Sequence, residues 1–331
     1  MLFQSTWSAM LIRRSLERDG NTLPRAWNAL AVIPDEYSYH LHHGKRHPIS
    51  TYSISLRSIT AQWLNVFSKL DALSREHNWE GTEASYPVLI AEYKELLYSL
   101  NEHFDACFSV LRSLCPPTAA PANLFDSQFL DKAKLPGWKK FRDSIKIYRD
   151  AHIGKLVNTL KHSQGELCSI FFYSTTEFRP GYYLRDVHPD GALGPSHKLH
   201  QNANTAFSFS RDMMIHFWWL FRTGDLLANT VGGALRTLHG VQVADRHQDA
   251  PDIGWEKLVT ECARLRPEFF PDEVEKPYPR ILHHADNRSL SIEFPSAARS
   301  HRVGPMRVQT QLTFDKNHPM NKLPYFGENG T

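Results

Sequence analysis

One stretch of the chain gathers the polar residues best placed to do chemistry. Near the end of an expected helix, Lys155, Asn158 and His162 follow one another at three- and four-residue steps, which places them on one edge of the helix. Histidine titrates close to neutral pH and can act as general acid or base, and a nearby lysine can stabilise a developing phosphorane charge. Lys161 and His162 would equally complement the helix dipole with no catalytic role. The spacing predicts a candidate acid–base site and leaves this second interpretation open.

Another side of the same helix is basic. Positions 138–162 contain seven Lys or Arg residues against two acids, Asp143 and Asp150. Like charges on one helix face add no stability, so the face is either solvated or binds an anion, with RNA or DNA phosphate the leading candidate. Four of the cations lie within an arc of about 80° at 100° per residue: Lys139, Arg142, Lys146 and Arg149.

The third side of the helix is apolar. Phe141, Ile145, Tyr148 and Leu156 lie within an arc of about 80°, and His152 lies among them. We expect this stripe to be buried. We interpret His152 as a core histidine with a hydrogen-bond partner and not as a catalytic one.

Periodicity predicts the elements that must position these residues. Apolar residues recur at three- and four-residue steps over 54–73, 86–111, 137–162 and 210–238, which predicts four long helices. Strand-like runs occur at 167–173, 181–187, 290–294 and 306–314.

The expected fold class is α+β, mainly an α-helical bundle with a small inserted β-sheet and a mixed, proline-rich C-terminal region. The bundle is expected over 51–240, with the β insertion at about 167–200. An irregular N-terminal segment occupies 1–50, and the mixed α/β region covers 241–331. Short connections between successive helices favour antiparallel packing of neighbours.

Composition excludes several classes of protein. Hydrophobic residues at 41% and charged residues at 22% are typical of a globular chain, and a net charge of +3 is too weak by itself to indicate nucleic-acid binding. Four scattered cysteines without a CxxC pair favour reduced thiols in a cytoplasmic protein. We see no secretory signal, and the most apolar window, 213–221, is about half a membrane span. Phosphate-loop, dinucleotide-binding and nucleophile-elbow motifs are absent from the sequence.

Three other groups of residues have types suited to metal binding or assembly. Asp186, His188 and Asp190 alternate and would share one side of a strand, which could seed a metal-dependent hydrolase, although the last of them lies in an ordinary turn sequence. Histidine clusters at 40–47 and 283–284 lack helical zinc spacing. We therefore expect no metal and no cofactor. The aromatic run 217–221 is expected in the core or at a subunit interface, which makes a homodimer through this helix a fair hypothesis.

The segment from Val157 to His162, which closes a long helix of an expected helical bundle, resembles the HEPN superfamily. That motif is an Arg, usually followed by a polar residue such as Asn, with a His four to six residues after the Arg. Asn158 and His162 match the motif, whereas the Arg position is Val157, and a shifted pairing would use Lys155. A guanidinium clamps phosphate with two parallel donors, which Lys cannot do. The resemblance covers about 51–165 and part of 205–240.

This resemblance implies a helical protein that engages RNA in a bacterial anti-phage defence or toxin–antitoxin setting. If it is a ribonuclease, cleavage is expected to be metal-independent, with His162 as acid and base, Asn158 orienting it, and Lys155 or Lys161 replacing the missing Arg. The alternative is a non-catalytic subunit that docks a protein partner as an interaction or scaffolding module. The sequence leaves open whether the chain is an enzyme.

Overall fold

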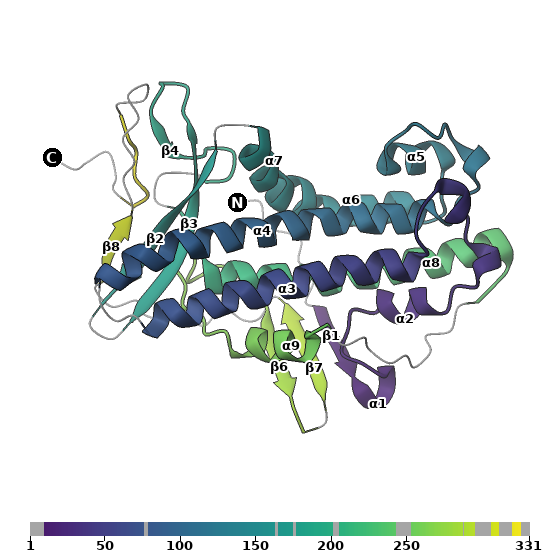
Figure 1. Ribbon diagram of the computed structural model, residues 1–331, viewed down its shortest axis with the longest axis horizontal. Coiled ribbons are helices and arrows are strands. Elements are labelled where there is room, and N and C mark those ends of the chain that lie inside the picture. The colour runs from purple at the N-terminus through teal and green to yellow at the C-terminus, as the bar shows by residue number, and fades with distance from the viewer. Residues whose placement is uncertain are drawn as a thin grey trace.

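The fold is known from a computed structural model. It describes residues 10–75, 79–162, 165–174, 177–200, 205–242, 253–286, 288–294, 306–310 and 320–325. Three long helices run side by side along the molecule, α3 (Pro48–Arg75), α4 (Trp79–Arg112) and α8 (Phe209–His239) (Figure 1). The most extensive helix packing joins α3 to α4. Within the described residues, every helix is too short or too polar to cross a bilayer.

The expected third helix is divided by a π-helical turn. α6 (Trp138–Tyr148) leads into the turn at Arg149–Ile153, and α7 (Gly154–His162) follows it. The turn holds one residue more than an α-helical turn, so the face downstream is rotated by about 100°. An added Cβ at Gly154 would overlap the carbonyl oxygen of Arg149, so glycine is the residue that lets the chain leave the turn.

Shorter helices surround these long ones. α1 (Leu16–Asp19) and α2 (Ala26–Ala31) precede α3, and α2 packs against α8. α5 (Asp126–Ala133) lies between α4 and α6, and α9 (Trp255–Arg264) contacts α3 and β6.

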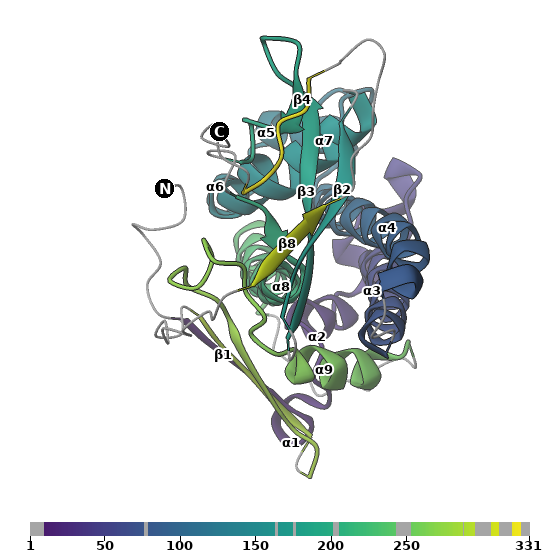
Figure 2. The same ribbon diagram turned by 90° about the vertical axis from the view of Figure 1, so that its left-hand side faces the viewer.

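Two antiparallel sheets complete the fold. One has the order β1-β7-β6, formed by Met10–Ser15, Ser289–Phe294 and Arg280–His284. The other has the order β4-β3-β2-β8, with β5 (Phe207–Ser208) also on β3. Its other strands are β4 (Leu193–Pro195), β3 (Phe178–Val187), β2 (Glu166–Tyr173) and β8 (Arg307–Thr310). Figure 2 shows the two sheets on different sides of α8.

The expectation of a mainly helical bundle with a small inserted sheet is wrong. Helices take 55% and strands 17% of the chain, and the strands form two antiparallel sheets, one of them curled into a half-barrel. The reason is long-range pairing: Met10 pairs with Phe294 and Ile170 pairs with Thr310. The expected irregular segment 1–50 therefore contains a sheet strand, and these pairings cross the expected boundaries near 50 and 240. The expected strand 306–314 is seen at 307–310, and positions 311–314 lie outside the described residues.

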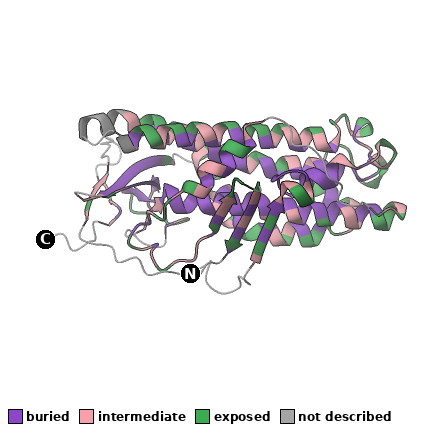
Figure 3. Cartoon of the chain, turned by 90° about the horizontal axis from the view of Figure 1, so that it is seen from below, coloured by how far each residue is buried: buried purple, intermediate pink, exposed green. Residues whose placement is uncertain are grey.

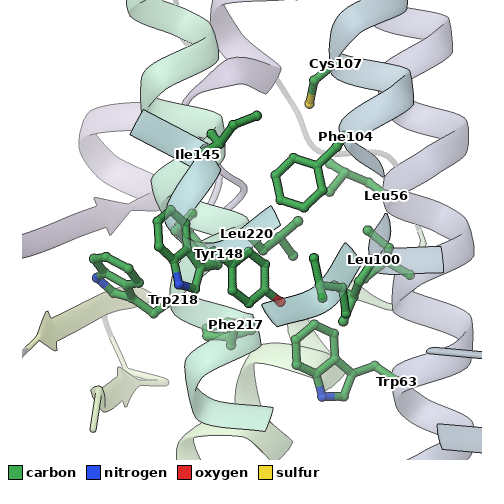
Figure 4. Packing of buried hydrophobic residues seen from close by; sticks show 14 of the residues in the cluster. Leu56, Trp63, Leu100, Phe104, Cys107, Ile145, Tyr148, Phe217, Trp218 and Leu220 are labelled. Atoms are coloured by element: carbon green, nitrogen blue, oxygen red, sulfur yellow. The ribbon is translucent and has the colours of Figure 1, made fainter. Parts of the chain in front are cut away.

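The core lies between the long helices and extends to both sheets. Buried positions line the inward sides of α3, α4 and α8, and exposed positions line their outer sides (Figure 3). Trp63 of α3 packs edge-to-face on Phe217 of α8, with ring centres 5.9 Å apart (Figure 4). Tyr148 stacks on Trp219 with ring centres 4.8 Å apart. The Trp63 contact fixes α3 against α8, and the Tyr148 stack fixes α6, and with it the π turn, against α8.

Candidate functional site

The predicted acid–base residues lie together on the surface of α7. Asn158, Lys161 and His162 are exposed, and Lys155 is half-buried. The ammonium group of Lys161 lies 4.8 Å from the ring centre of Tyr98 on α4, a cation–π contact that orients it. The structure thus brings these residues to one solvent-facing edge. We call Lys155, Asn158, Lys161 and His162 the α7 edge.

The position that would carry the motif arginine points the other way. Val157 is 1% exposed and belongs to the main core. A longer, charged side chain could not replace it without entering that core. Positive charge on the α7 edge therefore comes from lysine alone, which offers a point charge in place of a two-pronged clamp.

The predicted basic stripe is partly neutralised. Lys139 and Lys146 are exposed on α6. Arg142 forms ion pairs with Asp131 at 2.6 Å and Asp143 at 3.3 Å. Two of the four stripe residues are thus lysines on the open surface, and they are better placed to meet an anion.

Arg149, the fourth stripe residue, has several partners of its own. It pairs with Asp150 at 3.1 Å, and its guanidinium lies 4.9 Å from the ring centre of Phe108. This arginine mainly braces the π turn against α4. Its charge is therefore less available to an external phosphate than that of Lys139 or Lys146.

A second polar cluster, which we name the His–Asp–His cluster, lies inside the protein. It consists of His152 in the π turn and of Asp212 and His216 on α8. The exposed fractions of these side chains are 7%, 3% and 0%. His152 Nε2 lies 3.1 Å from Asp212 Oδ1, and His216 Nε2 lies 3.2 Å from Asp212 Oδ2. One ligand atom from each residue lies within 4.8 Å of the others, an arrangement found for no other His, Cys, Asp or Glu group among the described residues.

Three tyrosines from three elements close the cluster. The Tyr93 hydroxyl of α4 donates to Asp212 Oδ2 at 2.7 Å, and the Tyr182 hydroxyl of β3 donates to the same oxygen. The Tyr148 oxygen of α6 lies 2.5 Å from His216 Nδ1. The His–Asp–His cluster is therefore surrounded by hydrogen-bonding groups and joins the helical layer to the second sheet.

The neighbouring histidines keep the buried Asp212 carboxyl charged. Burial alone would raise its pKa, but His216 and His152 outweigh burial and hold the pKa of the Asp212 carboxyl well below its usual range. Burial and the neighbouring Asp212 charge raise the pKa of Tyr148 and Tyr182 well above the ordinary tyrosine value. The carboxyl is thus an acceptor, and the tyrosines keep their protons.

His200 lies beside the cluster in a neutral form. Its Nε2 accepts the Leu184 backbone N–H at 3.0 Å, and its ring lies 4.9 Å from Phe207, which in turn packs edge-on against His152. Burial, with a further contribution from the charge of His152, lowers the pKa of His200 to about 3. With Nε2 as acceptor, the ring proton sits on Nδ1.

The side chains of Asp186 and Asp190 do not face a common point. Asp186 is buried and accepts from Ser196 at 3.3 Å and Lys198 at 3.1 Å. Asp190 instead pairs with Lys322 at 2.6 Å at the surface. The two carboxylates serve separate contacts, so this strand end offers no shared site.

Two of the N-terminal histidines, His40 and His43, are held by hydrogen bonds within the fold. His40 bonds to the Ser38 hydroxyl at 3.0 Å, and His43 bonds to the Cys115 carbonyl oxygen at 2.9 Å. These two histidines thus have separate partners within the fold.

The aromatic run on α8 belongs to the core. Phe217, Trp218 and Phe221 are at most 3% exposed in the single chain. The run is covered by the protein itself, so it provides no exposed surface for the expected homodimer.

Sequence reasoning missed the His–Asp–His cluster because its members come from helices 60 residues apart. A signal was available: Asp212 and His216 stand one helical turn apart, at the start of and within the most apolar part of α8. Buried ionisable residues rarely occur unless they are paired. No family model, curated protein or solved structure matches the chain, so a functional assignment rests on the geometry of these two sites.

Proposed function

We propose that the chain binds RNA along the exposed sides of α6 and α7 and cleaves it slowly without a metal ion at the α7 edge. The observation that carries this proposal is the joint exposure of Asn158, Lys161 and His162 at the end of one helix. The bacterial defence or toxin-like setting is an expectation from the HEPN resemblance alone.

The chemistry needs a proton carrier and a positive charge beside a phosphodiester. The ribose 2′-hydroxyl would attack the adjacent phosphorus and the bond to the 5′-oxygen would break, which leaves a 2′,3′-cyclic phosphate and a 5′-hydroxyl. His162 would accept the 2′-hydroxyl proton or deliver one to the leaving oxygen, and Asn158 would orient it. Lys161 or Lys155 would stabilise the charge on phosphorus. Lysine in place of arginine leads us to expect a slow enzyme.

Binding is tested by its dependence on salt. For single strands, the logarithm of the affinity falls with the logarithm of salt concentration by about 0.7 per phosphate contact. Replacing Lys139 and Lys146 by Gln should therefore reduce the slope by about 1.4, measured by fluorescence anisotropy with a labelled RNA. Lys257→Gln, an exposed lysine on α9, is the matched control and should leave the slope unchanged. A salt-independent wild type would contradict RNA binding and favour a protein-docking role.

A further inference from the structure

We propose that His152, Asp212 and His216 bind one divalent transition-metal ion that ties the π turn to α8. Two imidazoles and one carboxylate are ligands typical of zinc and of non-haem iron(II). This site is independent of the α7 edge.

The distances within the cluster suit a shared ion. With metal–ligand bonds of about 2.0–2.2 Å, neighbouring ligand atoms are about 3.4 Å apart in a tetrahedron and about 3.0 Å apart at adjacent octahedral positions. The separations of 3.1 Å for His152 Nε2–Asp212 Oδ1 and 3.2 Å for His216 Nε2–Asp212 Oδ2 fall in this range. Because the two distances end on different oxygens, the Asp212 carboxylate would hold the ion through both of them.

The orientation of His216 is a second, independent observation. Its Nε2 is fully buried and lies 3.2 Å from Asp212 Oδ2, but the contact is too poorly aligned to form a good hydrogen bond. Two ligand atoms that face a common point between them are expected to meet in this way. A metal ion at that point would replace the poorly aligned contact with two metal–ligand bonds.

The surrounding tyrosines match what metal ligands require of their neighbours. A ligating histidine is usually fixed through its other ring nitrogen, and a ligating carboxylate is usually hydrogen-bonded in turn. Tyr148 holds His216 Nδ1 at 2.5 Å, and Tyr93 and Tyr182 both donate to Asp212. With Nε2 on the metal, Nδ1–H would donate to the Tyr148 oxygen.

Burial determines the kind of ion expected. All three ligands are buried, so an ion here would be enclosed and exchange slowly. The ion would stabilise the junction of α6, α8 and β3 and would take no part in surface chemistry at α7.

The test uses the full chain purified without a histidine tag. We expect about one equivalent of zinc or iron by elemental analysis, and after chelation one equivalent of Co²⁺ should restore a visible d–d spectrum and raise the melting temperature. His152→Gln and His216→Gln should abolish the Co²⁺ spectrum. His103→Gln, at a buried histidine on α4, is the control and should keep it.

A further variant tests the site even if the ligand variants fail to fold. Tyr148→Phe keeps every ligand and should weaken Co²⁺ binding by about 10- to 100-fold. A wild type that shows no bound metal, no Co²⁺ spectrum and no change in melting temperature with Zn²⁺, Co²⁺ or Fe²⁺ would overturn the proposal. A Co²⁺ spectrum that persists unchanged in His216→Gln would also overturn it, because the ion would then bind elsewhere.

Discussion

Replacing Asp212 by Asn should destabilise the protein by about 3–5 kcal/mol. The carboxylate is 3% exposed and meets two tyrosine hydroxyls and two imidazole nitrogens. An amide of the same shape offers one acceptor oxygen and turns an NH2 group toward a neighbour, so at least the contact to His152 is lost, and the charge that both imidazoles face disappears. Hydrogen bonds to charged groups contribute about 1.5–3 kcal/mol each, and removing one partner of a buried ion pair costs about 3–5 kcal/mol.

The assay is urea unfolding followed by tryptophan fluorescence, with both proteins exhaustively chelated so that metal binding does not add to the difference. Asp143→Asn is the matched control, because Asp143 is exposed and pairs with Arg142 at 3.3 Å, and it should cost less than about 1 kcal/mol. Equal, small losses in the two variants would refute the view that the His–Asp–His cluster organises the core.

Three further predictions concern stability. Burial raises the pKa of Glu273 to about 7, against 4.5 for an ordinary glutamate. Because the folded state holds this proton more tightly than the unfolded state, wild-type stability should fall by up to about 3 kcal/mol as pH rises from about 4.5 to 7. Glu273→Gln should remove this pH dependence in urea unfolding at pH 5 and 8. Burial lowers the pKa of His103 to about 4, so wild-type stability should fall by about 3 kcal/mol as pH drops from about 6.5 to 4. In His103→Gln the free energy of unfolding should depend less on pH over this range, and the difference from the wild type measures the loss. Gly181→Ala should cost at least about 1–3 kcal/mol, because the added Cβ would overlap the Phe207 carbonyl oxygen, whereas Gly232→Ala, with open space around it, should stabilise α8 by about 0.5–1 kcal/mol in thermal melts.

The long helices could be predicted because their signal is local. Leu56 and Trp63, seven residues apart, are both fully buried on α3. The second helix was expected over 86–111, yet α4 begins at Trp79 and carries Pro87 inside it. Proline often marks the first turn of a helix but does not exclude helix before it.

The sheets could be predicted only in part. β2 and β3 are consecutive, and their apolar runs stand out in the sequence. β1 pairs with β7 at the opposite end of the chain. Such a strand has no hairpin turn beside it in the sequence from which it could be predicted. Because four of the strands come from the two ends of the chain, the expected fold class failed at that point.

The candidate sites divide in the same way. The α7 edge depends on one helix, so spacing alone placed Asn158 and His162 together, and their catalytic role stays a prediction. His152 was expected in the core with a partner, and it lies there against Asp212. That partner is invisible to local periodicity because it belongs to another helix. The π turn, which rotates α7 relative to α6, likewise left no recognisable pattern.

The most direct test of the proposed function is incubation of the purified protein with mixed cellular RNA, beside His162→Ala and the control His284→Ala, an exposed histidine on β6. Thermal melts of all three confirm equal folding, and EDTA is added in a parallel arm. We predict products ending in 2′,3′-cyclic phosphate from the wild type and His284→Ala, with or without EDTA, and a loss of about 100-fold or more in His162→Ala. Intact RNA with the folded wild type, or equal cleavage by His162→Ala, would contradict it.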